Sequence, residues 1–305
     1  MIYVTAGHEE GIGLEVFLKS YLLLPKYQQK EFHLICHKET LEKNLKISHI
    51  SLDYDPLKIT YITDKPFSTS ALAKGIELCK HDDILLTLPT SKDQLILNGE
   101  KLAGHTEYFR RFFNKEVDMF FKSNESNVLL ITDHIPLNKV ASHISSELIN
   151  HKVELCVDNY KKYFGELKEI FITGINPHAG ENGILGNEDS VILDSVKSLG
   201  HKTKLKVNGP LPADGLLVNR QFSEEKLFVY MYHDQGLAPF KSLFKTIGAN
   251  ISLGLPFLRL SVDHGTAFEL FGKNEANYMG CYYVMKLALQ ALERIKCQNK
   301  QVQKT

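Results

Sequence analysis

The sequence predicts an α/β fold in which a parallel sheet is covered by helices. Short runs of β-branched and aliphatic residues alternate with longer runs of helical periodicity, which is the pattern of strands joined by crossover helices. A chain of 305 residues, 43% of them hydrophobic, is long enough for one large domain or two of ordinary size. No repeat or low-complexity linker interrupts the sequence, so any boundary must be crossed by ordinary secondary structure. We therefore expect two α/β/α lobes with a cleft between them.

The expected strands and helices follow one another along the chain. Strands are expected at residues 2–5, 32–36, 84–88, 128–132, 170–175 and 227–231. Helices are expected at residues 14–24, 68–79, 107–113, 138–164 and 189–198. The last long segment, residues 278–297, has apolar residues at helical spacing and a polar, basic end, so it predicts a closing amphipathic helix.

The charge balance and the N-terminus restrict the partners and the location that we expect. Lysine plus arginine equal aspartate plus glutamate at 36 each, so no global field draws the protein onto nucleic acid or a membrane. The chain enters a strand directly, without the features of a signal peptide, and no apolar window reaches the roughly 20 residues that span a bilayer. Five widely spaced cysteines without a Cys-x-x-Cys pair indicate reduced thiols. We expect a cytoplasmic protein.

Three histidines share the same kind of position. His134, His178 and His233 each lie within a few residues of the end of an expected strand, in a turn rich in Pro, Gly, Asp or Asn. The carboxyl ends of parallel strands border the crevice where ligands bind, so three imidazoles could converge there on one ion. Imidazole suits zinc and other divalent metals, and three protein ligands leave a coordination position for substrate. On position alone, three unrelated structural histidines remain an alternative.

The residues around these histidines resemble a known family. Four short segments carry the resemblance: Thr-Asp-His-Ile-Pro-Leu at residues 132–137, Asn-Pro-His-Ala-Gly-Glu at 176–181, Gly-Pro-Leu-Pro-Ala-Asp at 209–214 and Tyr-His-Asp-Gln-Gly-Leu at 232–237. They look like motifs of the 4-hydroxythreonine-4-phosphate dehydrogenases and occur in that family's order, with likeness from Gly7 to about Asn277. The resemblance implies an isocitrate/isopropylmalate dehydrogenase-like fold. It places a cofactor-side lobe at residues 1–108 plus 262–305 and a metal- and substrate-binding lobe at 109–261.

The resemblance also assigns the metal and the assembly. In the family, the histidines that match His134, His178 and His233 bind a divalent metal, which could be zinc, magnesium or cobalt. The family's site is completed across a homodimer interface, so a homodimer is implied for this chain as well.

A phosphorylated small-molecule substrate is implied by a second set of residues. Lys241, Asn250 and Arg259 supply an ammonium, an amide and a guanidinium, and they match substrate-binding positions of the family, as do His105 and Thr106. Arg259 interrupts the apolar run 251–262, where an unpaired cation would be costly. This predicts either a bound anion or an internal carboxylate beside Arg259.

The segment after residue 262 resembles the cofactor loop of the isocitrate and isopropylmalate dehydrogenases. The matching residues are His264, Gly265, Thr266, Glu269 and Asn277. A carboxylate at Glu269 would hold ribose hydroxyls and repel a 2′-phosphate, which favours NAD over NADP. The alternative is that Glu269 is only an exposed carboxylate at the start of a helix.

Some positions depart from the family pattern. The turn from Gly7 to Gly13 has Glu9 or Glu10 where a proline is usual, and Leu14 where another is usual. Residues 88–92 keep only part of the Thr-Gly-Pro-x-x-Lys pattern, Gly215 replaces a hydroxyl-bearing residue, and a Gly-Phe-Gly loop between residues 241 and 250 is absent. These departures concern the fit of substrate and cofactor rather than the ligand residues.

The function implied is NAD-dependent oxidation of 4-phosphooxy-L-threonine with decarboxylation to 3-amino-2-oxopropyl phosphate, in pyridoxine 5′-phosphate biosynthesis. Asp214, Asp234 and Asp263 lie in motif turns and are candidates for the proton acceptor. One alternative is a paralogue that oxidises another phosphorylated hydroxy acid with the help of a metal. An alternative of another class is a metal-dependent hydrolase that uses the histidines to activate water.

Overall fold

The computed structural model describes residues 1–53, 55–218 and 222–302. Contacts divide the chain into a first unit, Met1–Val117 with Thr246–Thr305, and a second unit, Asp118–Lys245. The chain crosses between the units twice, after Val117 and after Lys245, and neither residue lies in a helix or strand. The second crossing comes before residue 250, so both Asn250 and Arg259 belong to the first unit. Which unit serves the cofactor and which the substrate remains a proposal.

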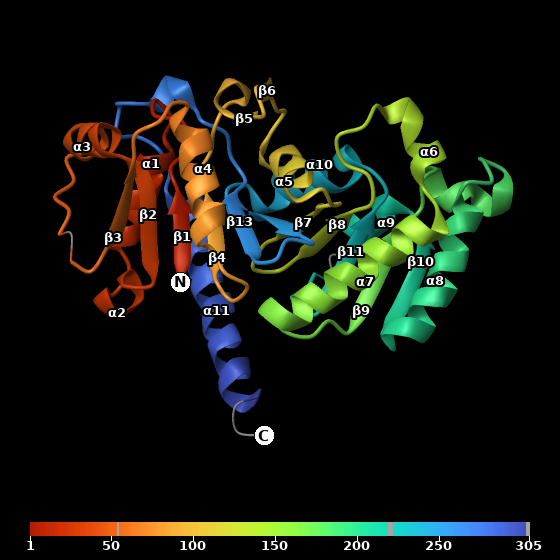
Figure 1. Ribbon diagram of the computed structural model, residues 1–305. Coiled ribbons are helices and arrows are strands. Elements are labelled where there is room, and N and C mark those ends of the chain that lie inside the picture. Colours follow the sequence, from red (N-terminus) through yellow and green to blue (C-terminus); the bar gives the residue numbers. More distant parts are fainter. Residues whose placement is uncertain (54, 219–221, 303–305) are drawn as a thin grey trace. The chain divides into compact units, whose positions relative to one another are not determined.

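The first unit is built on a sheet of mostly parallel strands (Figure 1). Its strands are β1 (Ile2–Thr5), β2 (Phe32–His37), β3 (Lys58–Ile62), β4 (Ile84–Thr87), β12 (Ala249–Leu253) and β13 (Leu258–Val262), with a small hairpin of β5 (Ile96–Leu97) and β6 (Glu100–Lys101). Its helices are α1 (Gly13–Leu22), α2 (Lys26–Gln29), α3 (Lys38–Ile47), α4 (Phe67–Leu78), α5 (His105–Phe113) and α11 (Met279–Val302), with 3-10 turns η1 (Lys92–Gln94) and η4 (Phe268–Leu270). The sheet order is β12-β13-β4-β1-β2-β3, and β12 alone runs antiparallel to its neighbour β13. All of β4 is buried, so both of its faces are covered.

The second unit repeats this architecture with a shorter sheet. Its strands are β7 (Asp118–Lys122), β8 (Asn127–Leu130), β9 (Glu169–Thr173), β10 (Lys206–Leu211) and β11 (Lys226–Tyr230). Its helices are α6 (Val140–His143), α7 (Ser146–Tyr163), α8 (Asp189–Thr203), α9 (Ala213–Val218) and α10 (His233–Phe244), with 3-10 turns η2 (Leu137–Lys139) and η3 (Pro177–Gly183). The order is β10-β9-β11-β8-β7, and β7 forms an antiparallel hairpin with β8.

The predicted α/β class is confirmed, and every predicted strand is present. The single helix predicted at residues 138–164 is wrong, because the chain breaks at Ile144 and Ser145 between α6 and α7. The Ser145 side chain accepts a hydrogen bond from the Leu148 amide and so caps the start of α7. The closing helix was predicted correctly and continues to Val302.

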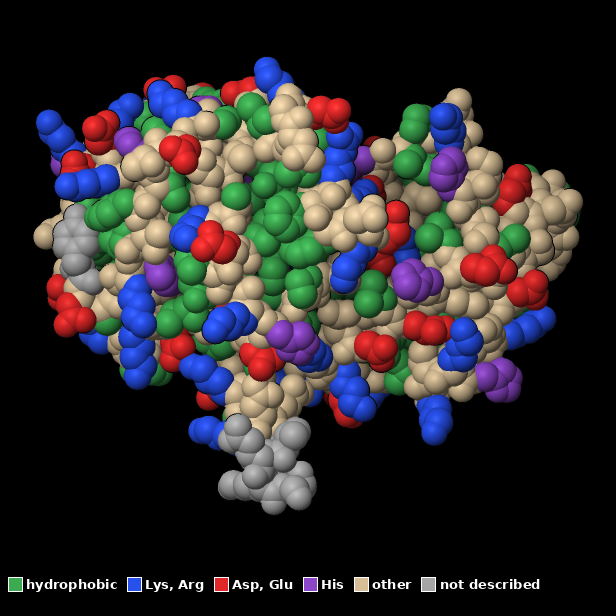
Figure 2. Space-filling model, in the orientation of Figure 1, with side chains coloured by type: hydrophobic (Ala, Val, Ile, Leu, Met, Phe, Trp, Pro, Cys, Tyr) green, Lys and Arg blue, Asp and Glu red, His purple; other side chains and the backbone are tan. Residues whose placement is uncertain are grey.

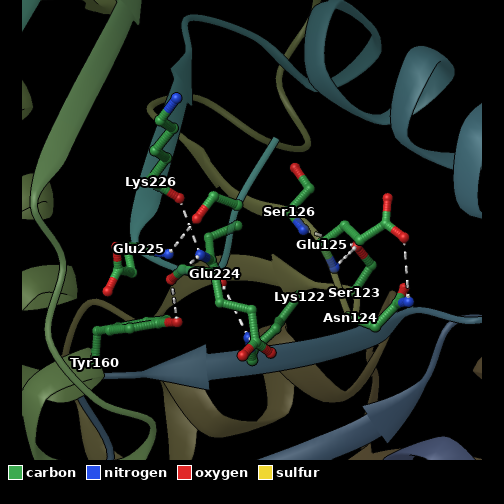
Figure 3. Close-up of polar contacts among 11 residues, drawn as sticks. Lys122, Ser123, Asn124, Glu125, Ser126, Tyr160, Glu224, Glu225 and Lys226 are labelled. Atoms are coloured by element: carbon green, nitrogen blue, oxygen red, sulfur yellow. Dashed lines mark hydrogen bonds and ion pairs between the residues drawn. The ribbon is translucent and has the colours of Figure 1, made fainter. Parts of the chain in front are cut away.

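The hairpin of β7 and β8 buries a cation. The Lys122 side chain is only 3% exposed, and its ammonium lies 3.1 Å from Glu224 Oε1 and 3.4 Å from Asn127 Oδ1 (Figure 3). The Tyr160 ring lies 5.5 Å from the same nitrogen. This cation is therefore neutralised within the second unit.

The surface carries both signs of charge. Figure 2 shows Lys and Arg side chains interspersed with Asp and Glu over the face in view, as the equal totals of 36 suggest. Among the residues described, no helix is both long and apolar enough to cross a membrane.

Candidate functional site

Two of the predicted metal ligands meet at the carboxyl edge of the second sheet. Strands β8 and β11 run parallel, and the Thr132 hydroxyl donates to the Met231 carbonyl at 2.7 Å just beyond their ends. His134 follows β8, and His233 begins α10 directly after β11. The centroids of the two imidazole rings are 5.5 Å apart. Neighbouring parallel strands thus bring both rings together, as the strand-end argument predicted.

The position of His233 depends on Gln235, to which the sequence analysis gave no role. Gln235 Oε1 accepts from the Thr173 hydroxyl at 3.0 Å and from the Met231 amide at 2.8 Å. Its Nε2 donates to the Gly174 carbonyl at 2.8 Å. These bonds fix the first turn of α10 to the ends of β9 and β11.

His178 lies in a strained turn after β9. His178, Ala179, Glu181 and Asn182 all have positive φ, between 45° and 56°. Left-handed backbone costs L-residues roughly 1–2 kcal/mol each, and strain of this kind clusters at functional sites. His178 Nδ1 is hydrogen-bonded to the Glu181 carboxylate. This bond raises the pKa of His178 above its ordinary value.

The three histidines do not yet form one ligand set. Within residues 1–53, 55–218 and 222–302, no group of three His, Cys, Asp or Glu side chains is arranged to hold a metal ion. The rings of His134 and His233 are neighbours, and Nδ1 of His178 is hydrogen-bonded to Glu181. Imidazole nitrogens suit a divalent metal, and two of the three predicted ligands lie side by side.

Carboxylates accompany each histidine. His233 Nδ1 is 2.6 Å from Asp234 Oδ1, and the Asp133 carboxylate accepts from the His134 amide at 2.6 Å. Asp214 contributes to the raised pKa of His178. A carboxylate on Nδ1 fixes the tautomer of an imidazole and leaves Nε2 for a ligand. Asp234 is therefore placed to orient His233, a role that sequence reasoning did not assign.

The first unit contains a buried guanidinium that no carboxylate of the described residues contacts. Arg259 on β13 is 2% exposed. Its Nε and Nη2 donate to Thr87 Oγ1 at 3.1 and 2.6 Å, and its Nη1 donates to Ser252 Oγ at 3.1 Å. The Phe109 ring lies 5.6 Å from its central carbon. Burial lowers the pKa of Arg259 to about 9, so the group stays charged at neutral pH.

Two further predicted substrate residues lie in the same unit as Arg259. Burial and then the Arg259 cation hold the pKa of His105 well below its ordinary value, so this imidazole is neutral at pH 7. Asn250 is two residues from Ser252 on β12 and shares its face. The Asn250 Oδ1 atom is buried without a hydrogen-bond partner. Both groups therefore lie in the same unit as a charge that no described residue neutralises.

The remaining two residues of the substrate set are less informative. Thr106 is buried in the first turn of α5. Lys241 is exposed on α10 of the second unit. The structure therefore places three members of the set near one another and leaves the relation of Lys241 to them a proposal.

The predicted cofactor loop lies in the first unit after β13. His264 Nδ1 is 2.9 Å from the Gly265 carbonyl, and its buried Nε2 has no hydrogen-bond partner. Glu269 is exposed in η4. Asn277 Oδ1 accepts from the Met279 amide at 2.9 Å and thus caps α11, a structural role. Nε2 of His264 is therefore a polar atom of the loop without a partner among the described residues, whereas the Asn277 side chain is already hydrogen-bonded to the Met279 amide.

The turn after β1 packs against this loop. The Ile12 amide donates to the Thr266 carbonyl at 3.0 Å, and the His8 and Phe268 rings lie 4.8 Å apart. A Cβ on Gly7 would lie 1.7 Å from the Pro89 carbonyl oxygen, so only glycine fits. The segments 7–13, 88–94 and 264–271 therefore meet at the carboxyl edge of the first sheet, where α/β folds bind ligands.

Comparison with known proteins identifies relatives along nearly the whole chain. The family described as "Pyridoxal phosphate biosynthetic protein PdxA" matches residues 15–288. A 4-hydroxythreonine-4-phosphate dehydrogenase of Sulfurihydrogenibium sp. (strain YO3AOP1) is 35% identical, with 96% of this chain and 98% of the relative covered. A protein of Oceanobacillus iheyensis named "Putative D-threonate 4-phosphate dehydrogenase" is 32% identical, with 90% and 92% covered.

Solved structures confirm the fold. A 4-hydroxythreonine-4-phosphate dehydrogenase from Burkholderia phymatum is 29% identical with a TM-score of 0.75, and 96% of this chain and 97% of that chain are covered. An isocitrate dehydrogenase from Methylococcus capsulatus, 10% identical with a TM-score of 0.53, shares the fold over 97% of this chain and 87% of its own. The predicted isocitrate dehydrogenase-like fold is therefore confirmed. Since motifs, fold and a match over most of its length agree, the chain belongs to the PdxA family of pyridoxal phosphate biosynthetic proteins.

Proposed function

We propose that the protein oxidises 4-phosphooxy-L-threonine with NAD and decarboxylates the product to 3-amino-2-oxopropyl phosphate, a step of pyridoxine 5′-phosphate biosynthesis. Relatives of 32–35% identity over 96% of the chain bear the name of this dehydrogenase. The observation that carries the proposal is the buried Arg259 guanidinium, whose hydrogen-bond partners among the described residues are hydroxyls. The names of the relatives favour an oxidoreductase over the metal-dependent hydrolase.

The substrate phosphate is the anion that we assign to Arg259. A guanidinium recognises phosphate through charge-assisted, bidentate hydrogen bonds. Asn250 and the neutral His105 would add an amide and an imidazole, with Thr106 and Lys241 completing the family's set. The unpartnered Asn250 Oδ1 requires a donor, which the ammonium or hydroxyl of such a substrate can provide.

We propose that His134, His178 and His233 hold a divalent metal, with zinc, magnesium or cobalt as candidates. Two rings already lie 5.5 Å apart at adjoining strand ends, and Asp234 orients one of them. The Glu181 carboxylate contacts Nδ1 of His178, which leaves Nε2 of His178 for the ion. When bound, such an ion supplies Lewis acidity that lowers the pKa of the substrate hydroxyl and stabilises the enolate left by loss of carbon dioxide.

The cofactor is proposed to be NAD, held by His264, Gly265, Thr266, Glu269 and Asn277. These residues would hold the cofactor, which when bound would supply the acceptor for the hydride of the hydroxyl-bearing carbon. Support comes from the exposed carboxylate of Glu269, which disfavours a 2′-phosphate. The buried Nε2 of His264, which has no hydrogen-bond partner among the described residues, is available to a cofactor.

The chain's own residues must move one proton and release carbon dioxide. The hydroxyl proton passes to a base, for which Asp214, Asp234 and Asp263 remain the candidates. The ketone lies β to the carboxylate, so the bond between the carboxylate carbon and the amino-bearing α-carbon breaks, carbon dioxide leaves, and the α-carbon regains a proton. Asp214 lies close enough to His178 to affect its pKa, whereas Asp234 is engaged by His233.

We further propose a homodimer whose interface completes the site. Leu137, Ile184 and Val218 have exposed fractions of 71%, 79% and 80%. They lie in the connections after β8, β9 and β10, whose carboxyl ends share one edge of the second sheet. Exposed apolar side chains beside a site are typical of a surface that another chain covers.

Five free cysteines are compatible with the proposed cytoplasmic location.

The test is the formation of NADH from 4-phosphooxy-L-threonine, followed by absorbance together with release of carbon dioxide and metal content. Wild type should show metal-dependent turnover, and His178→Ala should lose both turnover and bound metal. His151→Ala, on an exposed position of α7, is the matched control. Folded, metal-loaded wild type that forms no NADH would reject the proposed substrate.

A second candidate substrate is D-threonate 4-phosphate, favoured by the name of the 32% identical Oceanobacillus iheyensis relative. Both substrates carry the phosphate, so Arg259 cannot distinguish them. The ratio of their kcat/KM values, measured with one enzyme preparation, decides between the two.

A further inference from the structure

Two hydroxyls of neighbouring strands hold the guanidinium of Arg259. Strand β13 lies between β4 and β12, and Ser252 is directly opposite Arg259 in the antiparallel register. Thr87 Oγ1 accepts from both Nε and Nη2, and Ser252 Oγ accepts from Nη1. Thr87 and Ser252 are both buried. The guanidinium is therefore fixed from two sides by side chains that themselves belong to rigid strands.

These bonds leave part of the guanidinium available. An arginine side chain has five N–H groups, and the structure shows three hydrogen bonds from Arg259. One N–H on Nη1 and one on Nη2 thus have no acceptor among the residues that the structure describes. A pair of N–H groups on the two terminal nitrogens is suited to bidentate binding of an oxyanion.

The chemical nature of the partners matters as much as their number. A carboxylate beside Arg259 would orient the group equally well, but it would also cancel its charge and repel an incoming phosphate. Hydroxyl oxygens accept hydrogen bonds without a formal charge, so the full positive charge stays available. The absence of a carboxylate among the described partners is therefore informative.

We propose that Thr87 and Ser252 are positioning residues that orient Arg259 toward the phosphate of the substrate while leaving its charge unneutralised. The inference rests on the proposed function, because it assigns the substrate phosphate to Arg259. It adds to the proposed phosphate site two residues, Thr87 and Ser252, that act through Arg259.

The test measures the binding of inorganic phosphate to the full-length protein by the rise in melting temperature that a bound ligand causes. Thr87→Val removes the acceptor and keeps the shape, Ser252→Ala removes the second acceptor, and Thr87→Ser retains a hydroxyl. Thr5→Val is the matched control, because Thr5 is a buried threonine in register with Thr87 on the neighbouring strand β1.

Thr87→Val and Ser252→Ala should each raise the dissociation constant for phosphate by about tenfold, the value of one charged hydrogen bond. Thr87→Ser and Thr5→Val should bind phosphate as wild type does. The phosphate-induced increment is compared within each variant, so a lower melting temperature without phosphate does not affect the result. An unchanged increment in Thr87→Val and Ser252→Ala would overturn the inference.

Activity separates this inference from the proposed function. With 4-phosphooxy-L-threonine, Thr87→Val should raise KM far more than it lowers kcat. Wild type whose phosphate binding depends on Thr87 and Ser252 but which forms no NADH would reject the proposed reaction and leave the positioning role intact.

Discussion

Two buried cations, Lys122 of the second unit and Arg259 of the first, are compensated in contrasting ways. Lys122 in the second unit has a carboxylate, Glu224 Oε1, 3.1 Å from its ammonium. Arg259 in the first unit is equally buried, and its hydrogen-bond acceptors among the described residues are the hydroxyls of Thr87 and Ser252. Both cations lie beside aromatic rings, 5.5 Å from Tyr160 and 5.6 Å from Phe109. The surroundings differ chiefly in the presence of a counter-charge.

This difference separates a structural cation from a binding cation. Transfer of an unpaired charge into the interior is costly, so a buried cation needs a compensating partner. Lys122 has its partner within the chain, and its contribution is to stability. Arg259 has none among the described residues, so the compensating anion must come from a ligand, which we propose is the substrate phosphate.

The largest effect is expected when Arg259 is given a counter-charge like the one that Lys122 has. Ser252→Asp places a carboxylate beside Arg259, so the guanidinium is neutralised and the phosphate is repelled. We expect kcat/KM for the phosphorylated substrate to fall roughly 100-fold, because juxtaposed like charges cost several kcal/mol in a binding site. Ser252→Asn, of the same size without the charge, should lose much less. Equal losses in steady-state assays of both variants would show that charge is not the cause.

Removal of the counter-charge of Lys122 is expected to affect stability rather than activity. Glu224→Gln removes the counter-charge of Lys122, so the free energy of unfolding should fall by about 1–3 kcal/mol, the value of a charged hydrogen bond. Glu225→Gln is the matched control, because Glu225 pairs with Lys168 on the surface and such pairs contribute roughly 0–1 kcal/mol. Urea denaturation measures both. If Glu225→Gln stays active but loses as much free energy of unfolding as Glu224→Gln, the structural role of the Lys122–Glu224 pair is contradicted.

A smaller effect concerns the pH dependence of stability. The pKa of His105 is lowered in the folded protein, by burial first and by Arg259 second, so the unfolded state binds more protons below about pH 6.5. His105 therefore destabilises the fold progressively as the pH falls below that value. The unfolding free energy of His105→Asn relative to wild type should increase by up to about 1.4 kcal/mol per pH unit between pH 6.5 and 5.

The exposed His151 provides a control for this measurement. His151→Asn should show no such relative gain over the same pH range. A difference between His105→Asn and wild type that does not vary from pH 7.5 to 5 would rule out a depressed pKa at His105.

Much of the fold could be predicted because its signals are local. The predicted strands stand out as short apolar runs, and all of them are present. The break between α6 and α7 also has a local signal, because Ser145 is a favoured N-cap residue, but the apolar periodicity on both sides concealed it. Strands β12 and β13 were read as one apolar run, residues 251–262, because a tight turn between antiparallel strands adds no polar segment.

The site could be predicted only in part. Interruption of an apolar run by Arg259 predicted an anion or an internal carboxylate, and the described partners exclude the second choice at this position. Thr87 has no local signal, because it reaches Arg259 from 172 positions away through strand pairing. The strained turn of His178 was equally inaccessible, since a run of left-handed residues follows no sequence periodicity.

The central claim is that the unneutralised charge of Arg259 recognises the phosphate of the substrate. The most direct measurement is kcat/KM for 4-phosphooxy-L-threonine and for its unphosphorylated analogue, in wild type and in Arg259→Met. We predict that wild type prefers the phosphorylated substrate by at least about 100-fold and that Arg259→Met loses most of this preference, because a charged hydrogen-bonded contact to phosphate contributes roughly 2–5 kcal/mol. An unchanged preference in a folded Arg259→Met variant would contradict the claim.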